Sequence, residues 1–245
     1  MAKKMISHNL SEPLNGIPSA SFDIHTGTGN LTIDRLLSGE QLLAGGTVEY
    51  REDQDPPTPC VNTSHGRTTF ALRAEGGWRP SLRMPWSAFN GETNWQIHLN
   101  PAVSSDNTAH SGGGNVKLDL VGMLVTRVCA DSGGGNLDVV LPTDVTNVDV
   151  VAKSGGGTVT VEIGKGTMGS SSVHAQSGAG KVTVYVPSGL AARIHAMTGM
   201  GKVIIDPRFN QIDRNTYQSP DYDNATDKVE ITLKSGAGNV SANSK

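Results

Sequence analysis

The chain has 245 residues, of which 30 are glycine, and aromatic side chains make up only 4%, so its core must consist mainly of small aliphatic side chains. The formal net charge is −3 at pH 7 with both signs interspersed, which excludes the basic footprint of a nucleic-acid-binding or anionic-membrane-binding protein. Two cysteines, Cys60 and Cys129, are too few for a disulfide framework. We expect two free thiols, with a single bridge as the alternative.

Residues 1–17 are predicted to form a flexible segment. They contain lysines but no apolar run of signal-peptide length, and no later stretch is long enough to cross a membrane. The sequence as written therefore predicts a cytoplasmic protein without direct membrane insertion. A cell-surface or envelope location is the alternative, for a trimmed chain or one exported by an unconventional route.

Residues 18–105 are predicted to form an N-terminal β portion that carries an insertion with all three tryptophans. "GTVEYRE" and "TTFALRA" have the pattern of two antiparallel strands joined by a proline-rich loop, and "NWQIHLNP" of another strand with Trp95 in the core. A loop with tryptophan, arginine and proline on a rigid scaffold is typical of a contact surface for a protein or a sugar. The candidate binding residues are Trp78, Arg79, Arg83 and Trp86; alternatively, the two rings only cap an open end of the fold.

Residues 106–245 contain a repeat. The phrase Ser/Thr-Gly-x-Gly begins at Thr26, Ser111, Ser132, Ser154, Ser177, Thr198 and Ser235, and from Ser111 to Thr198 the steps are 21, 22, 23 and 21 residues. A constant period of this size is typical of stacked repeats. Apolar residues alternate with polar ones on both sides of the glycines, which indicates two short strands per repeat.

The repeat predicts an all-β protein, a parallel β-solenoid of stacked rungs of about 22 residues with two strands each, with an antiparallel insertion near the N-terminus. The glycines are expected at the hinge between the two strands, where positive φ and close backbone approach would both oppose a Cβ atom. Residues 207–228 are predicted to form a capping loop at the C-terminal end, because a bare terminal rung exposes unpaired edges and core.

The motifs that could carry chemistry are weak. "GAGKVT" does not complete a phosphate loop, because Ala175 stands where the first glycine is needed and Val182 follows the lysine where Ser or Thr is needed. "DYDNATD" lacks the glycine and the distal glutamate of an EF-hand. His174 and His195 stand three residues before their anchoring Ser or Thr, so in-register rungs would make them neighbours. They are weak candidates for zinc or copper ligands, and we prefer an exposed polar ladder. No catalytic constellation emerges, so we expect no enzyme and no cofactor.

The phrases "SGGGNVKLDLVGMLVTRVCADSGGGNLDVVLP", "SGAGKVTVYVPSGLAARIHAMTGMGKVIID" and "YQSPDYDNATDKVEITLKSGAGNVSAN" resemble the toast-rack, adhesin-like repeat proteins of prokaryotes. The resemblance covers nearly the whole chain from about residue 18. It implies a β-solenoid, no catalytic residues and an association with envelope stress and antibiotic response. We therefore expect a non-catalytic structural or protein-interaction scaffold whose partners are other proteins or copies of itself. The alternative is a carbohydrate or cell-wall binding module that uses Trp78 and Trp86.

Overall fold

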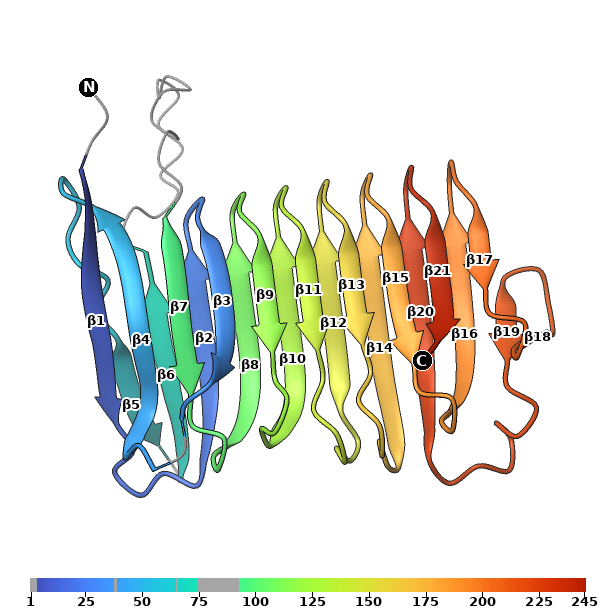
Figure 1. Ribbon diagram of the computed structural model, residues 1–245, viewed down its shortest axis with the longest axis horizontal. Helices are drawn as coiled ribbons and strands as arrows, with labels where there is room; N and C mark the ends of the chain where they lie inside the picture. Colours follow the sequence, from blue (N-terminus) through green and yellow to red (C-terminus); the bar gives the residue numbers. More distant parts are fainter. Residues whose placement is uncertain (1–3, 38, 65, 75–92) are drawn as a thin grey trace.

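The computed structural model describes residues 4–37, 39–64, 66–74 and 93–245, and its regular elements are all β-strands. They form two sheets that lie face to face along a long axis (Figure 1). Within the described ranges, no helix is long and apolar enough to span a bilayer.

Sheet A has ten strands, in the spatial order β1 (Met5–Pro13), β4 (Leu42–Arg51), β7 (Asn94–Leu99), β3 (Asn30–Arg35), β9 (Val116–Asp119), β11 (Leu137–Val140), β13 (Val159–Glu162), β15 (Val182–Val186), β21 (Val240–Ser244) and β17 (Val203–Ile205). Sheet B has eleven, in the order β18 (Asn210–Gln211), β19 (Thr216–Gln218), β16 (Ala191–Thr198), β20 (Lys228–Ser235), β14 (Ser170–Ser177), β12 (Asp149–Ser154), β10 (Val125–Ser132), β8 (Ser104–Ser111), β2 (Ser19–Thr26), β6 (Arg67–Arg73) and β5 (Cys60–Ser64).

Each rung of the solenoid consists of a strand in sheet B, a hinge and a returning strand in sheet A. Equivalent strands of neighbouring rungs pair in parallel and in register, as β10 does with β12 and β11 with β13. Their inward side chains form one continuous apolar core between the sheets. The predicted parallel solenoid is thereby confirmed, with antiparallel strands near the N-terminus.

The hinges are held together by one serine or threonine hydroxyl per rung. Ser132 Oγ donates to the carbonyl oxygen of Gly114 in the preceding rung at 2.8 Å and accepts the amide hydrogen of Gly135 in its own rung at 2.9 Å. The same hydroxyl-to-carbonyl bond is made by Ser111, Ser154, Ser177, Thr198 and Ser235. Since the hydroxyl bonds both rungs, the anchor position requires a small hydroxylated side chain.

The hinge glycines are required by close approach and not by backbone angle. A Cβ atom at Gly135 would lie 2.1 Å from the carbonyl oxygen of Gly114, well inside van der Waals contact. The predicted positive φ is wrong, because none of the described hinge glycines is among the residues with positive φ. Stacking at strand spacing, about 4.8 Å, leaves no room for a side chain at these two positions of each hinge.

An asparagine ladder next to the hinges was missed in the sequence analysis. Asn30 Oδ1 accepts the amide hydrogen of Asn115, Asn115 Oδ1 accepts that of Asn136, and Asn136 Oδ1 accepts that of Thr158, each at 2.9 Å. The recurring Gly-Asn dipeptide is its signal. The ladder satisfies backbone donors that would otherwise face solvent where each sheet A strand begins.

The N-terminal region differs from the prediction in two respects. Residues Met5–Pro13 of the segment expected to be flexible form β1, which pairs with β4. The predicted pairing of "GTVEYRE" with "TTFALRA" is wrong, since β4 lies in sheet A and β6 in sheet B. Instead β6 and β7 form a further rung outside β2 and β3, and residues 74–93 connect its two strands where other rungs have the short hinge.

Cys60 and Cys129 both carry free thiols. Cys60 lies in β5 and Cys129 in β10, with β6, β2 and β8 between them. At about 4.8 Å per strand this separation is far beyond the reach of a disulfide, so the bridge held as an alternative is ruled out by sheet order.

The C-terminal rungs are not in chain order. The last rung in sequence, β20 and β21, lies between the rung of β14 and β15 and the rung of β16 and β17. Short connections keep sequential rungs adjacent, but the segment 206–227 is long enough to carry the chain back to an inner position. Part of it forms β18 and β19, which extend sheet B beyond β16 in antiparallel fashion.

Asn107 is a polar residue on an apolar ladder, and we expect Asn107→Val to stabilise the protein by about 1–2 kcal/mol. Asn107 is fully buried and stands in register with Phe22 and Val128. Its amide nitrogen donates to Ser105 Oγ at 2.9 Å, but among the described residues its buried Oδ1 has no donor. Equilibrium unfolding in urea measures the change in the free energy of unfolding. A loss of stability in the valine variant, with an unchanged dependence of that free energy on urea concentration, would contradict the conclusion that Asn107 Oδ1 is buried without a donor.

Candidate interaction surface

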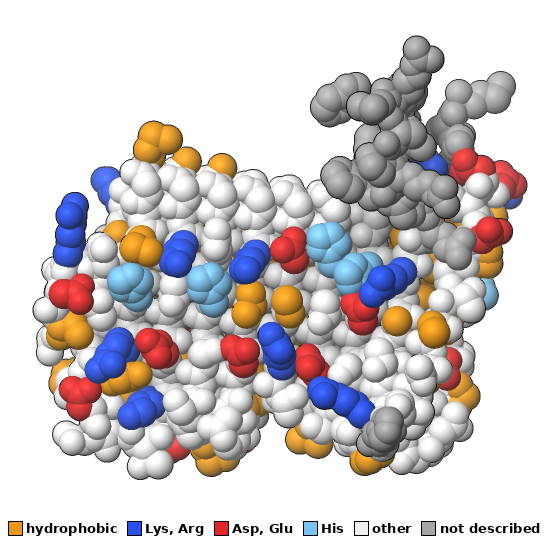
Figure 2. Space-filling view, turned by 180° about the vertical axis from the view of Figure 1, so that it is seen from behind, with side chains coloured by type: hydrophobic (Ala, Val, Ile, Leu, Met, Phe, Trp, Pro, Cys, Tyr) orange, Lys and Arg blue, Asp and Glu red, His pale blue; other side chains and the backbone are white. Residues whose placement is uncertain are grey.

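The outer face of sheet B carries three columns of side chains that run along the solenoid (Figure 2). They follow from register, because strand residues two apart point to the same face. The columns are named by their distance from the hinges. The hinge column, which is nearest, is Arg73, His25, His110, Asp131, Lys153, Gln176, Lys234 and Met197. The middle column is Asp23, Thr108, Cys129, Val151, His174, Thr232 and His195, and the outer column, which is farthest from the hinges, is Ser21, Asp106, Arg127, Asp149, Ser172, Glu230 and Arg193.

The outer column carries both signs of charge, which alternate from Asp106 through Arg127 to Asp149. Arg127 Nε lies 3.8 Å from Asp149 Oδ2, and Asp106 Oδ2 lies 3.6 Å from Arg67 Nη2. These pairs are largely exposed, so each contributes at most about 1 kcal/mol to stability. Their main effect is to give the face both signs of charge at fixed spacing.

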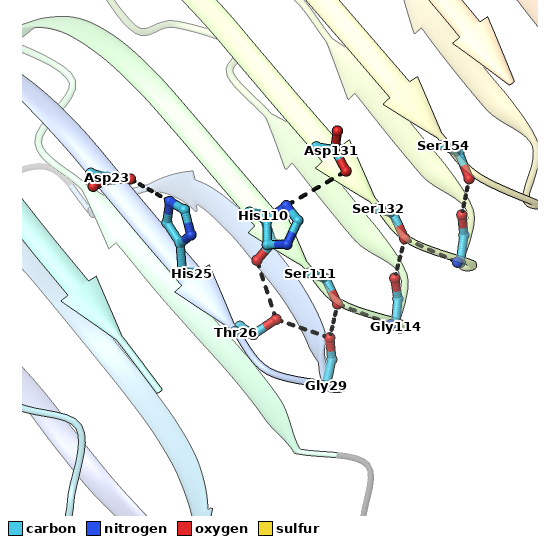
Figure 3. A network of polar contacts seen from close by, with 11 residues as sticks. Asp23, His25, Thr26, Gly29, His110, Ser111, Gly114, Asp131, Ser132 and Ser154 are labelled. Atoms are coloured by element: carbon cyan, nitrogen blue, oxygen red, sulfur yellow. Dashed lines mark hydrogen bonds and ion pairs between the residues drawn. The ribbon is translucent and has the colours of Figure 1, made fainter. Parts of the chain in front are cut away.

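The hinge column contains a pair of neighbouring histidines that the sequence analysis missed (Figure 3). The rings of His25 and His110 are stacked obliquely with centroids 5.3 Å apart. His25 Nε2 lies 2.6 Å from Asp23 Oδ1, and His110 Nδ1 lies 3.5 Å from Asp131 Oδ1. Each histidine directly precedes its hinge residue, Thr26 or Ser111, but the 85 residues between the two anchors hid their adjacency.

His174 and His195, which were expected to be neighbours, are not. Both stand in register with Thr232 of β20, which lies between their strands. His195 Nδ1 is 3.2 Å from Thr216 Oγ1. Burial lowers the pKa of His174 below its usual value, partly offset by a hydrogen bond with Gln176 and reinforced by two nearby lysines. In the part of the chain that the structure describes, no three His, Cys, Asp or Glu side chains are grouped to hold a metal ion.

Asp23 contacts two basic side chains of the surface, Arg73 and His25. Burial alone would raise its pKa, but the hydrogen bond from Arg73 and the charges of His25 and Arg73 outweigh that effect and lower the pKa below its usual value. Arg73 Nη2 lies 2.5 Å from Asp23 Oδ2. A carboxylate with a lowered pKa in the folded state stabilises the protein above its unfolded pKa, and this contribution is lost as pH falls through the folded pKa.

Arg73→Gln is therefore expected to raise the pKa of Asp23 and to lower stability at neutral pH by less than about 1 kcal/mol, since the pair is partly exposed. The difference from the unmodified protein should vanish once the pH is below the pKa of Asp23 in both. NMR titration of the Asp23 side chain, with unfolding midpoints at each pH, measures both effects. A stability difference that persists at low pH would show that Arg73 acts through packing instead.

The predicted contact residues Trp78, Arg79, Arg83 and Trp86 lie outside the described residues. The described residues that flank their segment, Ala74 after β6 and Thr93 before β7, are both hydrogen-bonded to the rung of β2 and β3. The amide of Ala74 donates to the carbonyl of His25, and the amide of Asn30 to that of Thr93. Ala74 and Thr93 therefore lie next to the rung that carries His25.

Comparisons with known proteins agree with this architecture. Residues 2–162 match the family model "N-terminal domain of toast_rack", and residues 166–242 match "Cell wall-active antibiotics response LiaF, C-terminal". The boundary falls in the turn between β13 and β14, which share one core, so the two models divide a single solenoid. A search of curated proteins finds no match.

Among solved structures, a candidate cell adhesion protein from Clostridium sporogenes is similar over 99% of this chain and 100% of its own, with a TM-score of 0.71 and 20% identity. This similarity shows the fold alone. Candidate adhesins from Bacteroides fragilis and Parabacteroides merdae align over 98% of the chain, and over 98% and 96% of their own, at 8% and 10% identity, with TM-scores of 0.30 and 0.32, too low to support an argument. From the matching family model, which covers residues 2–162, and the stacked rungs, the chain belongs to the toast-rack family.

Proposed function

We propose that this protein is a non-catalytic scaffold of the cell-envelope stress response that binds a protein partner on the outer face of sheet B. The observation that carries the proposal is the set of three in-register columns, which the hinge bonds hold at a fixed pitch. The match to the LiaF-like C-terminal model supports the link to the response to cell-wall-active antibiotics.

The charge pattern favours a folded protein as the partner. Acidic and basic side chains alternate in the outer column, as in Asp106, Arg127 and Asp149, so neither a polyanion nor a polycation would be attracted along its length. A partner surface with the opposite alternation would gain specificity more than affinity from such pairing. Because the columns repeat at strand spacing, a sheet or a helix laid along the solenoid could meet several rungs at once.

A charge-reversal experiment tests this proposal. The double variant Asp106→Lys and Asp149→Lys changes the outer face of sheet B, and the matched control, Asp119→Lys and Asp138→Lys, makes the same change on sheet A. Cross-linking in cells under antibiotic stress, followed by mass spectrometry, should recover a partner with the unmodified chain and the control but not with the sheet B variant. Equal recovery with both variants would contradict the assignment of the face.

Carbohydrate or cell-wall binding through Trp78 and Trp86 is the second candidate. The hydrogen bonds of Ala74 and Thr93 support it, because these flanking residues attach both ends of the segment to the rung of β2 and β3. Pull-down with purified cell-wall sacculi distinguishes the two functions. Binding that is lost in Trp78→Ala and Trp86→Ala, yet kept in the sheet B variant, would favour the glycan module over the protein scaffold.

A further inference from the structure

The terminal rung, formed by β16 and β17, is apolar where the inner rungs are not. The middle hinge position is glycine or alanine in the inner rungs from β8 onward, but here it is Met200, which is 73% exposed. On the outer face of sheet A, Ile204 stands in register with Ser241 and is 47% exposed; the corresponding residues of the inner rungs are Lys117, Asp138, Thr160 and Thr183.

The core ladder is also uncovered at this end. Val203 continues the row of Val116, Leu137, Val159, Val182 and Val240, all of which are fully buried, yet Val203 is 36% exposed. Ile212, in the connection between β18 and β19, is 54% exposed. Of the nine exposed large hydrophobic side chains among the described residues, four therefore lie at this end of the molecule, and a concentration of exposed apolar surface is typical of an interaction site.

The same end is stepped. Sheet A stops at β17, whereas sheet B continues for two more strands, β19 and β18 (Figure 1, right). Sheet A therefore lacks the two strand positions beside β17 that sheet B has, about 10 Å at the usual strand spacing. We call these two missing positions the recess. Phe209, which is buried, belongs to the apolar core at this end.

We propose that a second copy of the chain occupies this recess in a two-fold symmetric dimer. We call the contact a lap joint, because the β18–β19 hairpin of each copy overlaps the end of sheet A of the other. A two-fold axis parallel to the strands and midway between the sheets exchanges sheet A of one copy with sheet B of the other. The hairpin of β18 and β19 of each copy then fills the recess of its partner, and β18 comes beside β17 of the other copy. The proposal deepens the proposed function by naming one partner of the scaffold.

Strand count and direction favour this arrangement. The hairpin has two strands and the recess is two strands wide, so both layers become continuous without a gap. β18 is antiparallel to β19, and β19 to β16, whereas β17 returns from the β16 hinge. The joint therefore pairs β17 with β18 in antiparallel sense. It is also isologous and closed, as in most soluble homo-oligomers.

The other end-to-end arrangements fail on the same count. A two-fold axis perpendicular to the sheets would bring the two hairpins edge to edge and leave four strand positions empty between the two copies of sheet A. Head-to-tail stacking would put β1 of the next copy beside β17, but β5, which lies opposite β4 at that end, would then coincide with β18.

Sedimentation equilibrium of the full chain from about 1 to about 500 µM tests the joint. The weight-average mass should rise from 25.6 kDa to twice that value and no further. Ile204→Lys should weaken dimerisation at least about tenfold, whereas the matched control Leu124→Lys, at a turn residue 56% exposed, should leave it unchanged. A monomer at every concentration, a mass that grows beyond the dimer, or equal effects of the two variants would overturn the proposal.

Spin labels identify the end that joins. In a Cys60→Ser and Cys129→Ser background, Ala237→Cys labels a hinge next to the terminal rung, and Glu52→Cys labels the opposite end. The lap joint predicts a measurable dipolar coupling between copies for the first label and none for the second. The reverse pattern would overturn the joint, and it would leave the sheet B proposal untouched, because charge reversal at Asp106 and Asp149 is remote from either end.

Discussion

Gly135→Ala is expected to destabilise the protein by about 3 kcal/mol, whereas Gly134→Ala should change its stability by less than about 0.5 kcal/mol. The added Cβ at Gly135 would lie 2.1 Å from the carbonyl oxygen of Gly114, 2.3 Å from its carbon and 2.8 Å from the amide nitrogen of Asn115. All three are backbone atoms, so no side chain can move aside. At Gly134 nothing lies within 4 Å.

The chain itself supplies the control for this pair. Alanine already occupies the middle hinge position at Ala179 and Ala237, and neither of the two tight positions of the same hinges carries a side chain. Equilibrium unfolding in urea, with m compared between variants, measures the difference. If Gly135→Ala and Gly134→Ala unfold at the same denaturant concentration, the stacking distance at the hinge is larger than described.

Trp95→Ala should cost about 3–5 kcal/mol, because it removes a large side chain from the N-terminal core. Trp95 is 1% exposed, and its indole N–H donates to the carbonyl oxygen of Glu49 at 2.9 Å. It thus ties β7 to β4, the strand that reverses the parallel order. Thermal or denaturant unfolding gives the size of the loss.

Trp95→Phe separates the two contributions of this residue. It keeps most of the apolar volume and removes the hydrogen bond, so we expect an intermediate loss of about 1–2 kcal/mol. Fluorescence provides an independent readout, since a buried indole emits at shorter wavelength than an exposed one. A loss in Trp95→Ala as small as that of a surface substitution would mean that β7 does not form the core contact described.

The rungs could be predicted from sequence because the pattern of apolar and polar residues that forms each rung lies within one short segment and recurs at a constant spacing. Period-two alternation around residues such as Val159 and Val161 fixes which side chains point inward, and the constant spacing fixes that rungs stack in register. The pairing of β2 with β8 across 85 residues could not be read in this way, and neither could the insertion of β20 between β14 and β16. In both cases the connection is long, so the rule that consecutive strands lie next to each other no longer applies.

The candidate surface shows the same division. The three columns follow from register wherever connections are short, so the neighbours of Arg127 or Lys153 were predictable in principle. The stacking of His25 on His110 was not, because it depends on the long-range pairing of β2 with β8. His174 and His195 were misplaced for the converse reason: their equal positions in successive repeats implied contact, and one inserted strand separates them.

The middle hinge position has a consequence for how such a molecule can acquire new parts. It accommodates glycine, alanine, methionine and, in the rung of β6 and β7, a connection of some twenty residues, 74–93, while the flanking strands keep their pairing. The row of hinge tips is therefore a line of insertion points at strand pitch, where the chain can lengthen in any rung without altering the core. A segment inserted at Gly134 or Gly156 would project from the hinge edge of the solenoid, and segments inserted in different rungs would be spaced by multiples of the distance between strands.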